Sequence, residues 1–312
     1  TKVAANGKSF AVSGVKVDLK DPRLSLRVGI AWDRIGRTEA LGSLAKRAGA
    51  VAAINGSFFG AYTSDALKNP DMSLISKGQL IFKSNIGSVL GFSADNTPAI
   101  FTPRYRLTGT LRHESGRAES WFVYWINRKP TAATSVTLFT RHWGPSVDAA
   151  GGTLVVVRDG VVTDLTAATT AIPADGYIIQ IRGEAGLLRR FQVGDRIAFN
   201  PETTYMGSGS GEGVLEGIGA GPRVVENGKP VFNPSNEGFN DPKILERAGA
   251  RSAAGYTANR VLYLITVKSA RVRDLGAILK YLGCVEGINL DGGASSGLWL
   301  RGKYLTTPGR NI

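Results

Sequence analysis

Apolar and polar residues alternate over short runs along most of the chain, which is the pattern of half-buried β-strands. Clear runs cover residues 10–17 and 24–28 near the N-terminus and 153–157 and 161–163 in the middle. The last two flank Arg158-Asp159-Gly160, a sequence typical of a tight hairpin turn. Most of the chain therefore predicts short strands joined by turns.

Helical periodicity appears at three places. Residues 38–48 carry apolar side chains on one face and end at Gly49, and a short helix opens at Asp241-Pro242 and stops at Gly249. The clearest apolar helix face spans 275–282, between apolar strands at 261–267 and 285–290. Strand, helix and strand at this spacing predict a β-α-β unit with parallel strands. The predicted fold class is α+β, with mixed, strand-rich sheets, a few short helices and this C-terminal unit.

A length of 312 residues is enough for one large domain or two small ones with a proper core. We predict a single domain over 1–312, with a strand-rich lead at 1–36 and a strand-rich insertion at 105–200. The 40 glycines follow no collagen period and suit many tight turns. No run approaches 18 consecutive apolar residues, so the sequence predicts no membrane span.

Charge changes the picture, because 38 Lys and Arg oppose 25 Asp and Glu for a net charge of +13. The basic residues are dispersed, and Arg189-Arg190 is the tightest pair. A diffuse positive surface suits a polyanion, including a phosphorylated cell-envelope polymer. Arms that bind nucleic acid are usually denser in charge, so nucleic acid is disfavoured as a partner. A solvated basic surface with no specific partner stays open.

Several familiar sites are excluded by the residue inventory. Cys284 is the single cysteine, so the chain forms no internal disulfide and no cysteine zinc site. Residues 293–297 match the G-x-S-x-G pattern of serine hydrolases, which needs a histidine later in the chain. Both histidines, His113 and His142, come before Ser295. We therefore do not interpret Ser295 as a nucleophile.

Asp291 stands out because it directly follows an apolar strand and precedes two glycines, an alanine and two serines. A buried carboxylate without a partner is costly, and glycines allow a ligand to approach the backbone. This profile fits a binding or catalytic site at a strand end. An aspartate that caps the turn by bonding the next amides fits it equally well.

Four blocks in order along the chain resemble the signature blocks of the phosphodiester glycosidase family. Residues 289–296 read NLDGGASS, which closely resembles the family's NLDGGGSS. The others are INGSFF at 54–59, similar to INGGFF, GAGP at 219–222, followed by a hairpin, and RSAAG at 251–255, similar to RTAxG. The resemblance spans about residues 50–300. Ser57 and Ala294 stand where the family has glycine, and Arg223 replaces a residue that is usually aliphatic.

This resemblance implies an enzyme that hydrolyses the anomeric C1–O bond of a sugar-1-phosphodiester of the N-acetylglucosamine type. It also implies that the substrate is an envelope or extracellular glycan, a phosphorylated carbohydrate or anionic glycopolymer, and that the protein is secreted or lies in the cell envelope. The alternative is a non-catalytic module that binds anionic envelope polymers. Such a module would keep the glycine turns and the positive surface, but would not need Asp291.

The leaving group of this reaction is a phosphate, which departs readily as an anion, so one carboxylate and a set of phosphate ligands would suffice. Asp291 is the expected carboxylate, as base or electrostatic stabiliser. Arg251 is the expected phosphate clamp, and Asn55 would orient sugar hydroxyls or water. The expected substrate-binding residues are Gly56, Ser57, Gly221, Arg223, Gly292, Gly293, Ser295 and Ser296.

These motifs are far apart in sequence, and we expect them to converge in one cleft. Asp291 and Asn55 carry oxygen ligands of the kind that Mg²⁺ or Ca²⁺ prefers. No calcium-loop spacing supports a metal site, so we predict none and leave a divalent cation open.

Overall fold

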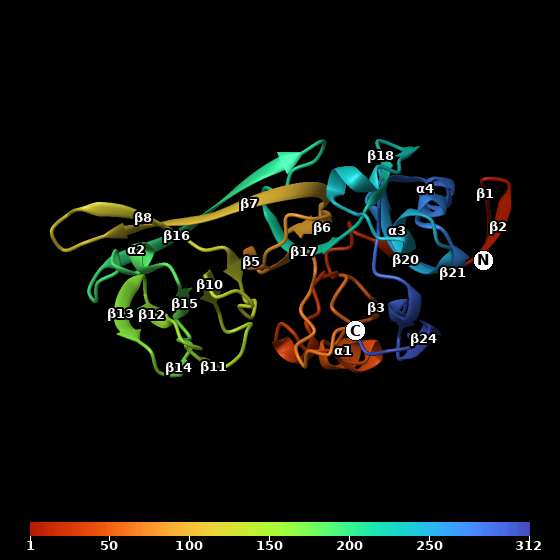
Figure 1. The fold of residues 1–312 in the computed structure, drawn as a ribbon. Coiled ribbons are helices and arrows are strands. Elements are labelled where there is room, and N and C mark those ends of the chain that lie inside the picture. The colour runs from red at the N-terminus through yellow and green to blue at the C-terminus, as the bar shows by residue number, and fades with distance from the viewer.

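The computed structural model describes residues 1–312 and has two lobes joined by a long strand pair (Figure 1). Strands dominate it, and the predicted strand-rich character with a few short helices is confirmed. None of its helices is long and apolar enough to cross a lipid bilayer. The helices are α1 (Leu41–Arg47), α2 (Ala185–Leu188), α3 (Pro242–Leu245) and α4 (Val272–Tyr281), with 3₁₀ turns η1 (Ala31–Asp33), η2 (Pro234–Glu237) and η3 (Gly293–Ser295).

A seven-stranded sheet forms the centre of the lobe that holds both termini. All its neighbouring strands are antiparallel. The strand order is β1 (Lys2–Ala5), β2 (Lys8–Asp18), β21 (Val261–Ala270), β20 (Gly249–Thr257), β22 (Cys284–Asn289), β18 (Arg223–Glu226) and β19 (Lys229–Pro230).

The C-terminal strand, helix and strand form at the predicted positions, as β21, α4 and β22, and Gly283 ends the helix with a φ of 84°. However, β20 lies between β21 and β22 and pairs antiparallel with both. The two strands run in the same direction, but they are not neighbours in the sheet. The reason is that β20, buried from Arg251 to Gly255, is itself suited to a central position.

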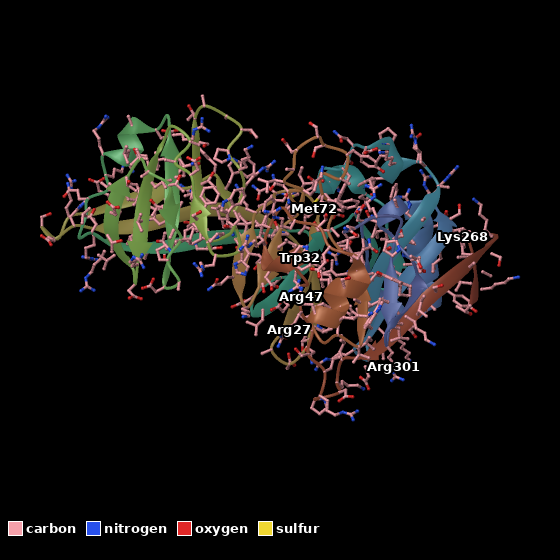
Figure 2. All side chains as sticks on the ribbon, turned by 90° about the horizontal axis from the view of Figure 1, so that it is seen from below. Arg27, Trp32, Arg47, Met72, Lys268 and Arg301 are labelled. Atoms are coloured by element: carbon pink, nitrogen blue, oxygen red, sulfur yellow. The ribbon has the colours of Figure 1, made fainter.

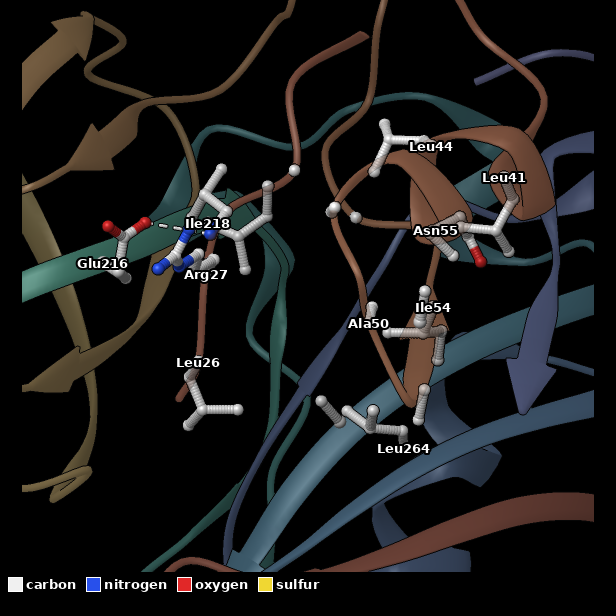
Figure 3. A pocket seen from close by; sticks show the side chains of 18 of the residues that line it. Leu26, Arg27, Leu41, Leu44, Ala50, Ile54, Asn55, Glu216, Ile218 and Leu264 are labelled. Atoms are coloured by element: carbon white, nitrogen blue, oxygen red, sulfur yellow. Dashed lines mark hydrogen bonds between the residues drawn. The ribbon is translucent and has the colours of Figure 1, made fainter. Parts of the chain in front are cut away.

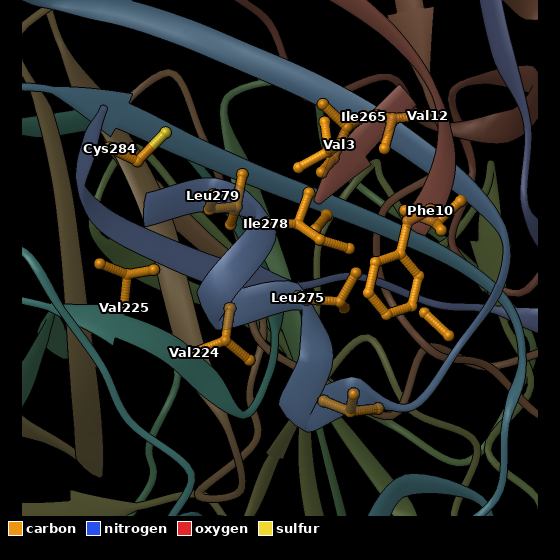
Figure 4. Packing of buried hydrophobic residues seen from close by; sticks show 14 of the residues in the cluster. Val3, Phe10, Val12, Val224, Val225, Ile265, Leu275, Ile278, Leu279 and Cys284 are labelled. Atoms are coloured by element: carbon orange, nitrogen blue, oxygen red, sulfur yellow. The ribbon is translucent and has the colours of Figure 1, made fainter. Parts of the chain in front are cut away.

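Helix α4 covers one face of this sheet and fixes its position (Figure 4). Leu275, Ile278 and Leu279 are fully buried and pack in one cluster with Phe10 from β2 and Val225 from β18. Burial of each such side chain contributes about 1.5–3 kcal/mol relative to exposure. The amphipathic face read from the sequence is therefore the contact that holds the N-terminal hairpin and the C-terminal strands together.

A second sheet of twelve strands runs through both lobes, and its long central pair, β7 and β16, bridges them (Figure 1). The predicted hairpin around Asp159-Gly160 forms as β12 and β13. The strand order is β5 (Gln79–Phe82), β4 (Leu74–Ser76), β17 (Val214–Ala220), β6 (Ser88–Ser93), β7 (Pro98–Arg112), β16 (Arg196–Met206), β13 (Val161–Thr166), β12 (Thr153–Arg158), β15 (Gly176–Arg182), β10 (Ser135–Phe139) and β9 (Trp125–Ile126), with β8 (Ala118–Phe122) on β7.

The lobe that lies between β7 and β16 in sequence has its own buried core, centred on Trp121, whose ring packs against Phe191 and Phe199. A two-stranded sheet, β11 (Ser146–Val147) and β14 (Thr170–Ala171), lies at its edge. A three-stranded sheet in the other lobe joins β24 (Lys303–Thr306), β23 (Leu298–Leu300) and β3 (Ala52–Ile54). The division into one domain with an N-terminal lead and an insertion at 105–200 stays a prediction.

The N-terminal lead differs from the predicted pattern in one segment. The run at 10–17 lies within β2, whereas residues 24–30 are extended but pair with no strand. We call residues 24–37 the strap. Burial alternates along residues 24–28 as the sequence predicts: Leu24, Leu26 and Val28 are half-buried, and Arg27 is exposed. A cavity lies beneath the strap in place of a neighbouring strand.

Two predicted helices are shorter in the structure. Helix α1 begins at Leu41 rather than at residue 38, because the backbone of Glu39 pairs instead with that of Ile312. Helix α3 covers Pro242–Leu245, and the Asp241 side chain caps it by accepting from the Lys243 amide at 2.8 Å.

Candidate active site

Two strand ends meet at the candidate site. Strand β3 is followed by Asn55, and β22 is followed by Leu290 and Asp291. The Asn55 side-chain amide donates to the Asp291 carbonyl at 2.6 Å, and the Asp291 amide donates to the Gly56 carbonyl at 2.9 Å. The first and last of the four sequence blocks are thus in direct contact.

Asn55 is 1% exposed, and protein groups bond both its side-chain nitrogen and its side-chain oxygen. Its Oδ1 accepts from the Ser252 hydroxyl at 2.7 Å and from the Gly297 amide at 3.0 Å. One side chain therefore joins the end of β3, strand β20 and the 291–297 loop. This arrangement favours a positioning role for Asn55, not the predicted direct contact with sugar or water.

The Asp291 carboxyl is half-buried, and burial raises its pKa to about 6. The Ser295 hydroxyl and the Gly292 amide bond to it and act in the opposite direction, and so does the positive charge of Arg310. The negative charge of Asp71 raises the pKa further. Asp291 therefore changes charge close to neutral pH, which suits a group that exchanges protons in a reaction.

Asp71 is a second carboxylate at this site that the sequence analysis did not identify. It lies in the loop after Pro70, where its amide donates to the Phe58 carbonyl at 2.8 Å. Asp71 as a whole is exposed, but protein atoms surround its carboxyl group, and this partial burial raises the pKa of Asp71. The positive charge of Arg128 has the opposite, smaller effect on this pKa. It follows no strand or helix pattern and belongs to none of the blocks, so no sequence signal marked it.

Arg251 reaches the site from β20 and is 6% exposed. Three backbone carbonyls hold its guanidinium: Nε donates to Ala270 at 3.2 Å, and Nη2 donates to Lys243 and Arg247, both at 2.6 Å. Burial lowers the pKa of Arg251, while the charge of Asp291 raises it. Nη1 bonds no protein group and lies beside Gly292, where an added Cβ would be 3.3 Å from it. The fixed guanidinium thus keeps one donor group for a ligand.

Two further cations lie around the exposed ring of Tyr62. The Arg310 guanidinium donates to the Tyr62 hydroxyl at 2.5 Å and lies 4.5 Å from the ring centroid, and Lys243 Nζ lies 4.9 Å from the same centroid. Neither cation forms an ion pair with a carboxylate, and neither does Arg251. Tyr62, Arg310 and Lys243 of α3 were also missed from the sequence, because nothing in their local pattern distinguishes them.

The 292–296 loop contributes backbone and hydroxyl groups. Gly292 donates its amide to Asp291 Oδ1 at 2.8 Å, so that amide is already used. Gly293, at a φ of 63°, faces open space, and its amide has no partner in the protein. Ser295 is buried beside Asp291, and the buried Ser296 hydroxyl has no partner. Of the predicted phosphate ligands in this loop, the Gly293 amide is the one best placed to meet a ligand.

Three further predicted substrate-binding residues, Gly56, Ser57 and Gly221, make contacts within the protein. Ser57 is half-buried and donates to the Phe58 carbonyl at 3.1 Å, and Gly56 packs closely on Ile218, where a Cβ would be 2.7 Å from the side chain. Gly221 is bonded to Asn289 twice, through its amide at 2.9 Å and its carbonyl at 2.7 Å. The GAGP block is therefore fastened to the end of β22, close to Asp291.

Arg223 is not placed as predicted. Its guanidinium pairs with Glu286 at 2.5 Å and Glu226 at 3.2 Å and donates to Ser208, so these groups neutralise and occupy it. The expectation that Arg223 adds a cation to the substrate site is replaced by a structural role between β18 and β22.

Neither histidine contacts Ser295. His113 bonds Asp195 at 2.8 Å in the other lobe, and His142 lies 3.3 Å from Thr140. No group of three or more His, Cys, Asp or Glu side chains is arranged to hold a metal ion. A divalent cation at this site would have to use Asp71, Asp291 and oxygen atoms of other kinds.

The family model described as phosphodiester glycosidase matches residues 151–312. The chain belongs to the phosphodiester glycosidase family. No curated protein sequence matches it.

Solved structures share the fold. A hypothetical protein from Synechocystis is 25% identical with a TM-score of 0.79, and the match covers 100% of this chain and 59% of that one. A putative exported protein from Burkholderia pseudomallei is 19% identical with a TM-score of 0.76, covering 97% of this chain and 71% of that one. The present chain thus spans little more than half of the Synechocystis protein.

Proposed function

We propose that this chain hydrolyses the anomeric C1–O bond of a sugar-1-phosphodiester of the N-acetylglucosamine type, releasing the sugar and a phosphomonoester. The observation that carries this proposal is a carboxyl with a pKa of about 6, Asp291, beside cations that no carboxylate neutralises. A site for an anionic substrate needs such free cations, and glycosidic bond cleavage needs a carboxylate near the anomeric carbon.

The cations bind the phosphate group of the substrate. Arg251 Nη1 and the Gly293 amide are donors without protein partners next to Asp291, and Arg310 lies close enough to lower the pKa of Asp291. Charge-assisted hydrogen bonds of this kind are short and strong. The phosphate leaves as an anion because the second pKa of a phosphomonoester is about 6, so no acid is required to protonate it.

Asp291 acts on the sugar. Its negative charge stabilises the oxocarbenium-like transition state, and the carboxylate accepts a proton from the attacking water. Burial, with a smaller contribution from the negative charge of Asp71, keeps the pKa of Asp291 high enough for this exchange near neutral pH. Asn55 and Ser252 act as positioning residues, since they hold the Asp291 backbone and the following loop in place.

The proposal is tested with the methyl diester of N-acetylglucosamine 1-phosphate, by measuring release of reducing sugar. Asp291→Asn should lower kcat by about 10²–10⁴-fold with little change in KM, because it removes a charge needed mainly in the transition state. The matched control is Asp164→Asn, an exposed aspartate on β13 in the other lobe. Normal turnover by Asp291→Asn would remove Asp291 from the mechanism. A parallel measurement with chelator shows whether a divalent cation takes part.

The rival function is a binding module for anionic envelope polymers without catalysis. It predicts that the wild-type chain releases no sugar, while Asp291→Asn binds the polymer at least as well as wild type.

We further propose that residues 1–312 act as a single catalytic domain and that the protein is secreted or lies in the cell envelope. Both follow from the family resemblance of the four sequence blocks.

A further inference from the structure

A large cavity lies beside the candidate active site, beneath the strap (Figure 3). Its volume is about 980 Å³, at the upper end of the roughly 300–1,000 Å³ typical of ligand pockets. The strap, α1, β3 and the seven-stranded sheet enclose it. The cavity is partly open to solvent, and its size is sufficient for a ligand.

Most of the residues that line the cavity are hydrophobic. Leu26 from the strap, Ile54 from β3, Ile218 from β17 and Leu264 from β21 are all half-buried, because one side of each faces this space. Each 1 Å² of apolar surface removed from water contributes about 25 cal/mol. The lining therefore favours an apolar ligand over a sugar.

Residues 24–30 of the strap are attached weakly enough to admit such a ligand. They form no strand pair, and three side chains from elsewhere in the chain hold their backbone. Glu216 accepts from the Val28 amide at 2.9 Å, and Asn96 and Arg47 donate to the Leu24 and Ile30 carbonyls, both at 3.0 Å. A segment with so few backbone hydrogen bonds opens locally at low free energy.

The rim of the cavity is positively charged. Arg27, Arg34 and Arg37 of the strap are exposed and take part in no ion pair, and Arg301 lies at another edge (Figure 2 labels Arg27 and Arg301). Apart from Asp291, the acidic lining residues are engaged: Asp21 pairs with Arg23, Asp18 accepts from the Lys20 amide, and Glu216 accepts two backbone amides. This charge matches a ligand with an anionic head and an apolar chain.

The cavity is continuous with the candidate active site, because Ser57 and Asp291 are among its lining residues. We propose that the substrate is a lipid-linked sugar phosphodiester whose long-chain alcohol occupies this cavity. This inference rests on the proposed function. Water adds its oxygen to C1 as the C1–O bond breaks. The phosphate oxygen keeps the bonding electrons, Asp291 takes the proton from water, and the products are the free sugar and an alkyl phosphate monoester.

The test compares the methyl, octyl and hexadecyl diesters of N-acetylglucosamine 1-phosphate, each below its micelle concentration. Each buried methylene should raise kcat/KM about fourfold until the cavity is filled, so the seven extra methylenes of the octyl diester should raise kcat/KM about 10⁴-fold over that of the methyl diester. Hexadecyl phosphate alone should bind, measured by calorimetry, and inhibit competitively.

Two variants address the cavity without touching the reacting groups. Ala50→Phe reduces its volume, and Leu26→Asn makes the strap polar at unchanged size. Both should lose the chain-length effect while keeping wild-type kcat/KM on the methyl diester, which also shows that they fold. Ala168→Phe, at an exposed position in the other lobe, is the matched control and should behave as wild type.

Equal kcat/KM for the methyl and hexadecyl diesters, with no binding of hexadecyl phosphate, overturns the lipid substrate and leaves the proposed hydrolysis standing. Binding of hexadecyl phosphate that Ala50→Phe abolishes, together with no hydrolysis of any diester, overturns the proposed function while supporting the cavity as a lipid site.

Discussion

Asp291 is surrounded by groups that act on its charge in opposite directions. Burial and Asp71 disfavour the ionised form, while Ser295, Gly292 and Arg310 favour it, and the balance leaves its pKa at about 6. The sequence could indicate Asp291, Asn55 and Arg251, because each lies in a recognisable block beside an apolar strand. It could not indicate Asp71 or Arg310, which reach the site from irregular loops.

The pH dependence of turnover should report this balance. If ionised Asp291 is required, kcat/KM should fall as the pH drops below about 6. Asp71→Asn removes a negative charge that raises the pKa of Asp291, so the acid limb should move to lower pH. Arg310→Gln removes a positive charge that lowers this pKa, so the limb should move to higher pH. Profiles measured from pH 4 to 9 check both shifts, and shifts of the same sign would contradict the assignment.

At the scale of elements, most strands and the apolar face of α4 follow from periodicity, whereas strand partners do not. Strands β21 and β22 are separated by β20, and residues 24–30 alternate without pairing at all. The alternation of apolar and polar residues shows which side chains of a segment are buried. It does not show whether a strand, a helix or a cavity lies next to that segment. The contact between the blocks at 54–59 and 289–296 was expected from the resemblance, and Asn55 makes that contact.

Asn55 should therefore matter for stability. Asn55→Ala leaves the Ser252 hydroxyl, the Gly297 amide and the Asp291 carbonyl without their partner, so we expect it to lower the free energy of unfolding by about 2–4 kcal/mol. Ser252→Ala removes one of these bonds and should lower it by about 1 kcal/mol. Urea unfolding measures both. Equal stability of Asn55→Ala and wild type would mean that the strand ends are held by other contacts.

At the scale of the whole molecule, the net charge is +13, and the basic side chains differ in whether a carboxylate pairs with them. Ion pairs occupy Arg47, Arg117 and Arg223, while Arg251, Lys243 and Arg310 at the site have none. The total charge could be read from the sequence, but the positions of the unpaired cations could not. Three of these cations lie at the site, where the anionic substrate proposed above would need them.

Substrate binding should weaken with salt. Exposed charges are screened beyond about 8 Å at physiological ionic strength, so KM for the methyl diester should rise several-fold between low and high salt. Lys243→Gln should reduce this dependence, because it removes an exposed cation beside Tyr62. Lys280→Gln, on the exposed side of α4, is the matched control. A KM that is the same at all salt concentrations would show that the basic surface does not contribute to substrate binding.

The paired strands β7 and β16 have a consequence for how this protein can change over evolutionary time. They lie side by side from Thr102 opposite Met206 to Arg112 opposite Arg196. The chain therefore leaves and re-enters the lobe that holds both termini at neighbouring points. A change in the length of the segment between these points would leave the ends of β3 and β22 where they are, so we expect the other lobe to tolerate insertions and deletions that the site would not.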